Sequence, residues 1–568
     1  MFGKTWQASR RQYGMRVDRD VAIPVSAGHS LDADVYRPDA PGRFPAILCP
    51  HAYSKDDHVA PLMPVGFSHA RGHMESGDPN FYARRGYAQV LVNVRGTGKS
   101  GGAFGNLGAP TIQDICEVTD WLATQPWCDG NVGMFGASYF SLVTGLVAAQ
   151  KPKNLKCIFA PFAWSDAYRD RYYQGGILNY GFSKIWFETL PETTFEPGLR
   201  ATWGDARLKQ ALAAALADEE LASVPFLVNV FRNPDLGGHK VLLETLLRPL
   251  DDAYYRERSV SYANKPDVPA YFGACWGVYG THLPGAFRNY TNWSGPAKLS
   301  IGPPLYLDRP LYQYGYESLR WFDHWLKGVD TGMMDEPPIA LFVDGPGEWK
   351  FVNEWPLPET RWTPFYLHEN GLLSEHEFWP HEAPTTFGDS PFGRGSATFT
   401  TPQFVEATEI CGPMVLTLYG STTSDDVLWF VSLFEVAADG GERLLTRGWL
   451  RGSQRRLDEA KSTPWQPYHA HDRREPLTPG EIYRFDIEVR PYCILMRPGS
   501  RLALRIKCAD DEKPQTALQA IALGHIARPH SARVTIHHDA DHPSALMLPI
   551  TRGNQMEMFI SGGVPLKP

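Results

Sequence analysis

A chain of 568 residues exceeds the size at which one hydrophobic core usually stops growing, so we expect more than one domain. A net charge of −8 with 43% hydrophobic residues suits globular domains and gives no reason to expect nucleic acid or an anionic membrane as a partner. No apolar run reaches the ~20 residues of a membrane span, and no signal peptide is expected. Eight cysteines without CxxC spacing, mostly in apolar stretches, predict a reduced, cytoplasmic protein.

The first 163 residues predict strands that alternate with helices. Predicted strands lie at Val21–Val25, Leu31–Tyr36, Phe44–Pro50, Ala88–Val94 and Leu155–Ala160, and a helix is expected from Thr111 to Thr124. Short, fully apolar strands separated by helices are typical of a doubly wound, mostly parallel sheet. This part of the chain is therefore expected to be an α/β domain.

The stretch 131–149 carries the clearest functional signal. A short apolar strand runs into Gly-Ala-Ser-Tyr at 136–139, and an apolar helix follows from Leu142. A strand that turns sharply into a helix, with small residues before a serine, is typical of a nucleophile elbow. The turn would place the Ser138 hydroxyl at a helix N-terminus, where backbone N–H groups can stabilise an oxyanion. An ordinary strand–turn–helix is the alternative.

The alternation of strands and helices stops between about 164 and 265. Helical stretches there, Asp205–Glu220 and Lys240–Leu247, predict a cap inserted over the sheet. The sheet resumes with Val268–Ala274 and Ala297–Ile301. From Pro337, short alternating strands predict an all-β sandwich or jelly roll. We therefore predict an α/β domain at 1–163 and 266–336, a helical cap at 164–265 and a jelly roll at 337–568.

The loop Arg95–Gly102 contains Gly-Lys-Ser, as a Walker A motif does. That motif requires a glycine five residues before the one that precedes the lysine, and Asn93 stands there. The loop also continues into two more glycines where a helix would have to begin. It is predicted to be a structural turn beside the active site, and no cofactor is expected.

Several separated segments carry a resemblance to known proteins. They are Val90–Gly102, Trp121–Tyr139, Trp321–Gly328, Leu444–Leu457 and Arg497–Leu502. Together they resemble the CocE/NonD hydrolases, the cocaine-esterase-like and X-Pro dipeptidyl-peptidase-like group, over nearly the whole chain. The resemblance implies an α/β-hydrolase domain, a helical cap and a C-terminal jelly roll, which agrees with the division made from the residues alone.

The resemblance also implies roles for three residues. Ser138 falls on the family's nucleophile in G-x-S-Y-x-G, with Ser141 in place of the last glycine. Tyr53 follows the first central strand, where the family places a tyrosine whose hydroxyl helps to form the oxyanion hole. The backbone N–H of Tyr139 would supply the second donor. For Tyr53, a buried aromatic with a satisfied hydroxyl is the alternative.

The other two members of the family's catalytic triad are missing from their usual places. The family's acid follows a tryptophan as W-x-D, but this chain has Val278 two residues after Trp276. The family's histidine follows the last strand as I-G-P-W-x-H, but Tyr306 stands there. A serine hydroxyl is a weak nucleophile without an adjacent base, so both departures affect the chemistry.

His282 is the nearest candidate in topology for a relocated base. It lies just beyond the strand that normally carries the acid, and a capping or packing role is the alternative. His51 and His58 share the Tyr53 loop and could approach Ser138, although loop histidines are more often solvated.

Three further groups have mainly structural interpretations. His324 is expected to be a structural helix residue, and Asp308 could orient a base but more simply pairs with Arg309. Asp56 and Asp57 precede His58, but no second cluster completes a set of metal ligands. No metal site is therefore expected.

Two functions remain open on the sequence. The first is a serine hydrolase or acyltransferase that acts on a small ester or amide through an acyl-Ser138 intermediate, with an atypical or incomplete triad. The second is a degenerate hydrolase that keeps the fold and pocket and acts as a binding protein. Neither substrate identity nor oligomeric state follows from the residues.

Overall fold

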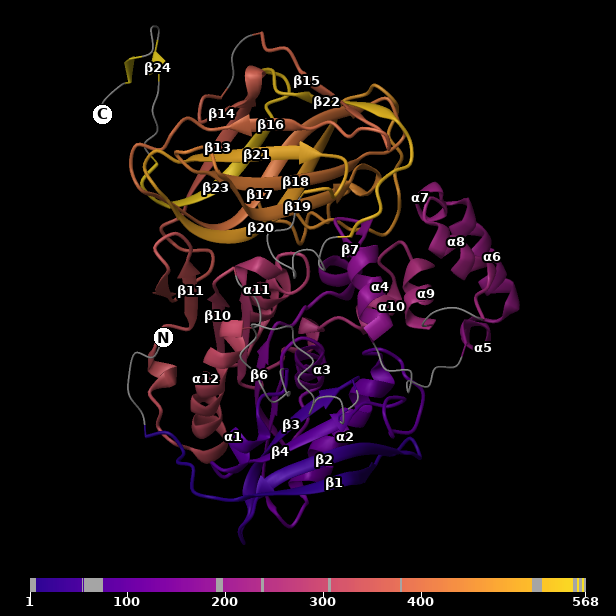
Figure 1. The fold of residues 1–568 in the computed structure, drawn as a ribbon, viewed down its shortest axis with the longest axis vertical. Helices are drawn as coiled ribbons and strands as arrows, with labels where there is room; N and C mark the ends of the chain where they lie inside the picture. Colours follow the sequence, from indigo (N-terminus) through magenta and orange to yellow (C-terminus); the bar gives the residue numbers. More distant parts are fainter. Residues whose placement is uncertain are drawn as a thin grey trace.

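The computed structural model describes residues 7–53, 55, 75–189, 198–235, 240–304, 308–377, 381–512, 524–554, 559–560 and 564–565. Figure 1 shows three parts: a sheet with its helices, indigo to rose, in the lower half, a group of magenta helices at one side, and an orange-to-yellow β-domain above them.

Ten strands of the described chain form one mixed sheet in the order β1-β2-β4-β3-β5-β6-β9-β10-β11-β12. Neighbouring strands from β4 to β11 in this order are parallel, whereas β1, β2 and β12 pair antiparallel at the two edges. The strands are β1 (Met15–Pro24), β2 (Ser30–Pro38), β3 (Phe44–His51), β4 (Ala88–Asn93), β5 (Cys128–Phe135), β6 (Leu155–Pro161), β9 (Ala270–Cys275), β10 (Ala297–Gly302), β11 (Ile339–Val343) and β12 (Glu348–Val352). The predicted doubly wound sheet is confirmed.

Helices cover the sheet because its central strands are apolar on both faces. They are α1 (Pro79–Ala83), α2 (Ala109–Ala123), α3 (Tyr139–Ala148), α11 (Leu283–Asn292) and α12 (Asp308–Lys327). Every residue of α3 is buried, and this helix packs on β3, β5 and β6. A helix that is apolar on all sides needs such complete burial.

The sheet extends beyond the boundary predicted at residue 337. Ile339–Val343 pairs in parallel with β10, and Glu348–Val352 follows it at the edge. Because β11 lies next to this edge strand, its buried and half-buried residues alternate, as they would in a sandwich strand. The sequence pattern could not assign these two strands to the first sheet. Their hydrogen-bonded pairing with β10 and with each other shows that they belong to it.

The cap begins with η2 (Ala167–Tyr172), a turn of π-helix, and the short hairpin β7 (Tyr173–Gln174) and β8 (Ile177–Leu178). Its helices are α4 (Tyr180–Thr189), α5 (Leu199–Trp203), α6 (Asp205–Ala217), α7 (Glu219–Ala222), α8 (Pro225–Arg232), α9 (Lys240–Leu246) and α10 (Ala253–Glu257). The single helix predicted over 205–220 is divided, because the Asp218 side chain accepts hydrogen bonds from the backbone N–H groups of Glu220 and Leu221 and starts α7.

The C-terminal domain is a β-sheet that closes on itself, because β23 pairs with both β13 and β17. The resulting flattened barrel agrees with the predicted jelly roll. Its strands are β13 (Arg361–His368), β14 (Leu372–Ser374), β15 (Thr385–Asp389), β16 (Ala397–Thr400), β17 (Thr408–Thr422), β18 (Leu428–Val436), β19 (Glu442–Arg451), β20 (Tyr483–Met496), β21 (Arg501–Lys507), β22 (Ala532–His537) and β23 (Ala545–Arg552).

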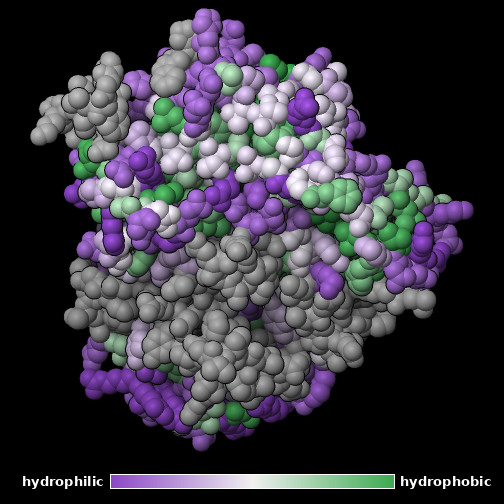
Figure 2. All heavy atoms as spheres, turned by 45° about the horizontal axis from the view of Figure 1, so that its top comes forward, coloured by the Kyte–Doolittle hydropathy of each residue, from purple (hydrophilic) through white to green (hydrophobic). Residues whose placement is uncertain are grey.

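The surface of the cap differs from that of the β-domain. Figure 2 shows hydrophobic side chains gathered over the outer cap helices, where Phe226 is 41% exposed, beside a mostly polar junction with the β-domain. Among the helices of the described chain, none combines the length and the apolar character needed to cross a bilayer.

Candidate active site

Ser138 stands where β5 ends and α3 begins. Its φ of 54° and ψ of −124° lie outside the regions that residues with a side chain normally adopt, and it is the N-cap residue of α3. The neighbouring Gly136 cannot carry a side chain, because a Cβ there would lie 2.1 Å from Cβ of Phe140. A strained serine between a strand and a helix, with a glycine that permits their close approach, is the geometry of a nucleophile elbow.

The backbone around Glu75 is fixed against this elbow. The Ala137 N–H donates to the Glu75 carbonyl at 2.7 Å, and the Gln89 side-chain amide donates to the Ser76 carbonyl at 2.6 Å. Gln89 is itself buried in the central strand β4. The Glu75 segment is therefore held beside Ser138 by one backbone hydrogen bond from the elbow and one side-chain hydrogen bond from β4.

The Glu75 carboxyl group receives a hydrogen bond from the Ser138 hydroxyl. Burial raises the pKa of Glu75 to about 8, against the opposite effect of that hydrogen bond. Its Oε2 atom is buried without a hydrogen-bond partner. A carboxyl group with a pKa near neutral, in contact with a serine hydroxyl, is suited to accept and return a proton.

Tyr53 and Tyr139 lie together beside the elbow, with ring centroids 6.1 Å apart. The Tyr53 hydroxyl accepts a hydrogen bond from the Trp186 indole N–H at 3.2 Å, and burial keeps its pKa well above the usual value, so that it stays a protonated donor. As the first residue of α3, Tyr139 has a backbone N–H with no carbonyl partner inside the helix. Both groups are chemically able to bind an oxyanion.

The loop predicted to be a structural turn is tied to Tyr53. The side chain of Asn93, at the end of β4, donates to the Tyr53 carbonyl at 3.0 Å. Ser100, in the turn, donates its hydroxyl to the Asn93 carbonyl at 2.7 Å. The glycine-rich turn therefore helps to position the tyrosine that the sequence nominates for the oxyanion hole.

His282 lies at the N-terminus of α11, packed against Phe162 and parallel to the Trp164 ring at 6.4 Å. Burial and the positive charge of Arg171 lower the pKa of His282 to about 3, and its Nδ1 atom is buried without a hydrogen-bond partner. The imidazole is thus neutral, and among the described side chains no carboxylate is hydrogen-bonded to it as a triad acid would be. Val278, at the usual position of that acid, is buried just after β9.

The other residues considered from the sequence contribute less. Tyr306, His58, Asp56 and Asp57 lie outside the described residues, as does the side chain of Asp308. His51 is buried and stacked on Phe140 at 4.9 Å, and His324 packs edge-on against Trp325 in α12. Within the described residues, no group of three or more His, Cys, Asp or Glu side chains is placed to hold a metal ion.

Glu75 and Arg171 were missed by sequence reasoning. Glu75 follows a long segment of mixed polarity with no motif around it, and Arg171 stands in a charged run of the cap that resembles a solvated surface. Only the position of Glu75 in the loop after β3, which also contains Tyr53, could have directed attention to it.

Comparisons with known proteins match both parts of the chain to known domain families. Residues 27–304 match the X-Pro dipeptidyl-peptidase (S15) family, and residues 331–547 match the X-Pro dipeptidyl-peptidase C-terminal non-catalytic domain. Cocaine esterase from Rhodococcus sp. is 26% identical over 606 aligned positions, which cover 94% of this chain and 99% of that protein.

Two solved structures share nearly the whole architecture. A CocE/NonD family hydrolase from Staphylococcus aureus has a TM-score of 0.79 and 25% identity, over 95% of this chain and 94% of that one. An aminopeptidase from the marine sediment archaeon Thaumarchaeota archaeon has a TM-score of 0.71 and 16% identity, over 97% and 99%, a likeness of fold alone.

Proposed function

Because the chain belongs to the CocE/NonD family of α/β-hydrolases, which are serine hydrolases, we propose that it cleaves a small ester or amide through an acyl-Ser138 intermediate. The observation that supports this most directly is the contact between the strained Ser138 and the buried carboxyl group of Glu75. It supplies a proton acceptor at the nucleophile although the usual acid position holds Val278.

In the proposed reaction, ionised Glu75 accepts the Ser138 proton while Oγ forms a bond to the acyl carbon. The carbonyl electron pair moves onto oxygen, and the Tyr53 hydroxyl and the Tyr139 backbone N–H stabilise the resulting oxyanion. When the intermediate collapses, the bond to the leaving group breaks and Glu75 returns the proton to that group. Water then attacks the acyl carbon and gives a proton to Glu75; as the bond to Ser138 Oγ breaks, Glu75 passes that proton to Oγ and the acid is released.

Glu75 is a better proton acceptor here than His282. The imidazole of His282 has a pKa of about 3, because it is buried and close to Arg171, and so it binds a proton weakly near neutral pH. Glu75 has a pKa of about 8 and touches the hydroxyl directly. A base is most effective when its pKa lies near the operating pH. A role for His282 as base remains a prediction of the sequence.

Covalent labelling with an alkyl fluorophosphonate tests this proposal. The adduct is expected on Ser138, identified by mass spectrometry of its peptide, and should be absent in Ser138→Ala. Glu75→Gln should slow labelling by about 100-fold or more, the usual contribution of a general base. His282→Gln serves as the matched control and should label far faster than Glu75→Gln. A folded wild-type protein that forms no adduct would contradict the proposal.

A degenerate hydrolase that acts as a binding protein is the second candidate. It is favoured by Val278 in place of the acid and by the neutral His282, whose Nδ1 atom has no partner. In that case Ser138 stays unlabelled, while small esters or amides still bind to the folded protein. The fluorophosphonate experiment therefore separates the two candidates.

A further inference from the structure

Arg171 is a buried cation in η2, the π-helical turn that follows β6. Arg171 is only 1% exposed, and within the described residues its guanidinium group contacts the Tyr172 hydroxyl but forms no ion pair with a carboxylate. The polar groups that act most on its charge are the phenols of Tyr172, Tyr53 and Tyr254, and no carboxylate is among them. Turns of π-helix are rare and are often found at functional sites.

Aromatic rings surround the guanidinium group. Its central carbon lies 4.4 Å from the ring centre of Phe182, 4.8 Å from Trp186, 4.9 Å from Tyr172 and 5.1 Å from Trp164. These cation–π contacts attract the cation but supply no opposite charge. Burial lowers the pKa of Arg171, yet an arginine in a protein stays protonated.

The neighbouring charged residues of the same turn all form ion pairs. Arg169 pairs with Asp166 and Asp251, each at 2.8 Å, and Asp170 pairs with Arg288. Arg171 stands directly beside Asp170 in sequence but shares none of these partners. A buried charge that no carboxylate of the described residues neutralises is costly, which points to an anion supplied from outside the chain.

Arg171 is separated from the elbow by one aromatic ring. The Trp186 indole lies between it and Tyr139, stacked on the Tyr139 ring at 5.8 Å, and donates its N–H to the Tyr53 hydroxyl. The charge of Glu75 raises the pKa of Tyr53, and the charge of Arg171 lowers it. The guanidinium group is therefore close to the tyrosine nominated for the oxyanion hole, and the two residues that link them, Tyr53 and Trp186, are only partly buried.

We propose that Arg171 binds a carboxylate carried by the substrate, so that the ester or amide cleaved at Ser138 is an anion. A planar carboxylate can accept two parallel hydrogen bonds from a guanidinium group, and these bonds are strong in a site without water. The Trp186 ring would turn aside to admit this group. The inference rests on the proposed function for the reacting bond, whereas binding of the anion does not require catalysis.

Calorimetric titration of the Ser138→Ala protein tests the inference with three amides of one core. N-phenylbutanamide is neutral, N-phenylsuccinamate carries the carboxylate on the acyl side, and 4-butanamidobenzoate carries it on the leaving side. At least one acid should bind about tenfold or more tightly than the neutral amide. A second substitution, Arg171→Gln, should remove that preference, and Arg171→Lys should keep part of it, because the charge remains.

Equal binding of all three amides by Ser138→Ala overturns the inference, as does a preference for an acid that survives Arg171→Gln. If circular dichroism shows that the glutamine variant does not fold, Arg171→Met replaces it, and the comparison of acids with the neutral amide still decides. The proposed function fails by a different result, namely the absence of a fluorophosphonate adduct on Ser138 in the wild-type protein, a reaction that needs no carboxylate.

Discussion

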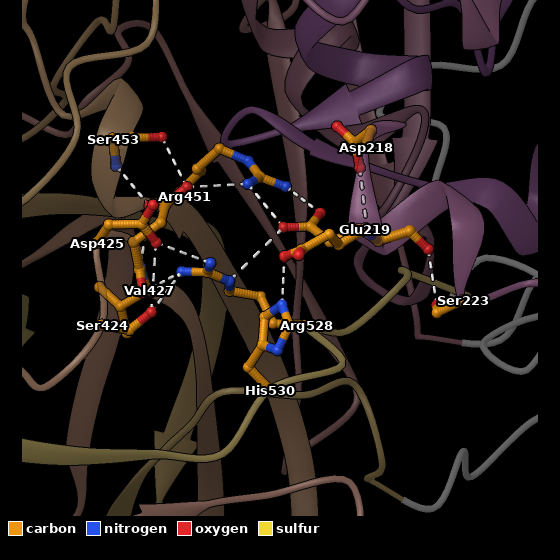
Figure 3. Close-up of polar contacts among 12 residues, drawn as sticks. Asp218, Glu219, Ser223, Ser424, Asp425, Val427, Arg451, Ser453, Arg528 and His530 are labelled. Carbon is orange, nitrogen blue, oxygen red and sulfur yellow. Dashed lines mark hydrogen bonds and ion pairs between the residues drawn. The ribbon is translucent and has the colours of Figure 1, made fainter. Parts of the chain in front are cut away.

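Two regions of the molecule each bury an arginine: the junction between the cap and the β-domain, and the site around Ser138. They differ in whether carboxylates neutralise its charge. At the junction, Arg451 donates from Nη1 to Glu220 and to Asp426, each at 2.9 Å, and from Nε to the Gly176 carbonyl at 3.2 Å. Figure 3 shows Arg451 and the neighbouring Arg528 between the strands of the β-domain and the α7 end of the cap. At the Ser138 site, Arg171 has no carboxylate or carbonyl partner among the described residues and contacts only the Tyr172 hydroxyl.

The buried acidic groups of the two regions differ in the same way, in whether a cation lies beside them. Glu220 and Asp426 are satisfied by Arg451, and these carboxylates raise the pKa of Arg451 although burial acts against it. Glu75 is buried with no cation among the groups that shift its pKa. The candidate site thus holds a buried carboxyl group without a cation and a buried guanidinium group without a carboxylate, and both act on Tyr53. The junction uses buried charge for stability, whereas the site keeps it available for a reaction and a ligand.

Arg451→Met should show the largest effect on stability. It leaves Asp426 buried without its cation and Glu220 with only Arg528, 4.0 Å away, and breaking such a buried pair typically costs about 3–5 kcal/mol. A clear fall in the thermal unfolding temperature is expected, measured by calorimetry at fixed scan rate. An unchanged unfolding temperature would mean that the junction does not depend on this pair.

Glu75→Gln should raise the free energy of unfolding above that of the wild type by more at pH 8 than at pH 5. Because burial raises the pKa of Glu75 to about 8, its protonated form favours the folded state below the unfolded pKa near 4.5, and this contribution is lost as the pH rises through 8. The neutral amide avoids the loss, a gain of up to about 4 kcal/mol over this window. Exposed Glu348→Gln is the control and should show no such difference.

The rate of Ser138 labelling should rise with pH. Only ionised Glu75 can accept the proton, and with a pKa of about 8 its ionised fraction grows about tenfold from pH 7 to pH 9. Labelling rates measured from reactions quenched at set times across this pH range should be half-maximal near pH 8. Glu75→Gln should flatten the profile, and a flat wild-type profile would remove Glu75 as the base.

Arg171→Met should change stability by less than about 1 kcal/mol, or raise it, since an unpaired buried charge is replaced by an apolar side chain of similar length. The matched change at Arg451 provides the contrast. If both substitutions lower the unfolding temperature equally, the two arginines do not differ as their contacts indicate.

His530→Ala should have the smallest effect, within about 0.5 kcal/mol, because exposed ion pairs contribute little. His530 contacts Glu219 at the rim of the same junction, with side chains 46% and 68% exposed. The same unfolding measurement checks it. A loss comparable to that of Arg451→Met would show that the rim, and not the buried pair, holds the cap.

The periodicity of the chain was sufficient to predict the α/β domain, the cap and the β-domain, and local sequence was sufficient to nominate Ser138. Elbow geometry is encoded within a few residues: Gly136 is needed where strand and helix touch, and the apolar run after Ser138 buries α3 completely. The edge strands β11 and β12 were assigned to the wrong sheet because alternation does not reveal the partner of a strand.

By itself, then, the sequence determined the architecture, the nucleophile elbow and the absence of an acid at Val278. The tertiary structure alone decided which groups face Ser138. Glu75 reaches the hydroxyl through a loop held by the sheet, and His282, the sequence candidate, lies in an apolar layer where burial and Arg171 keep it neutral. Burial and the company of other charges set the pKa of a side chain, and neither property is written in the residues next to it.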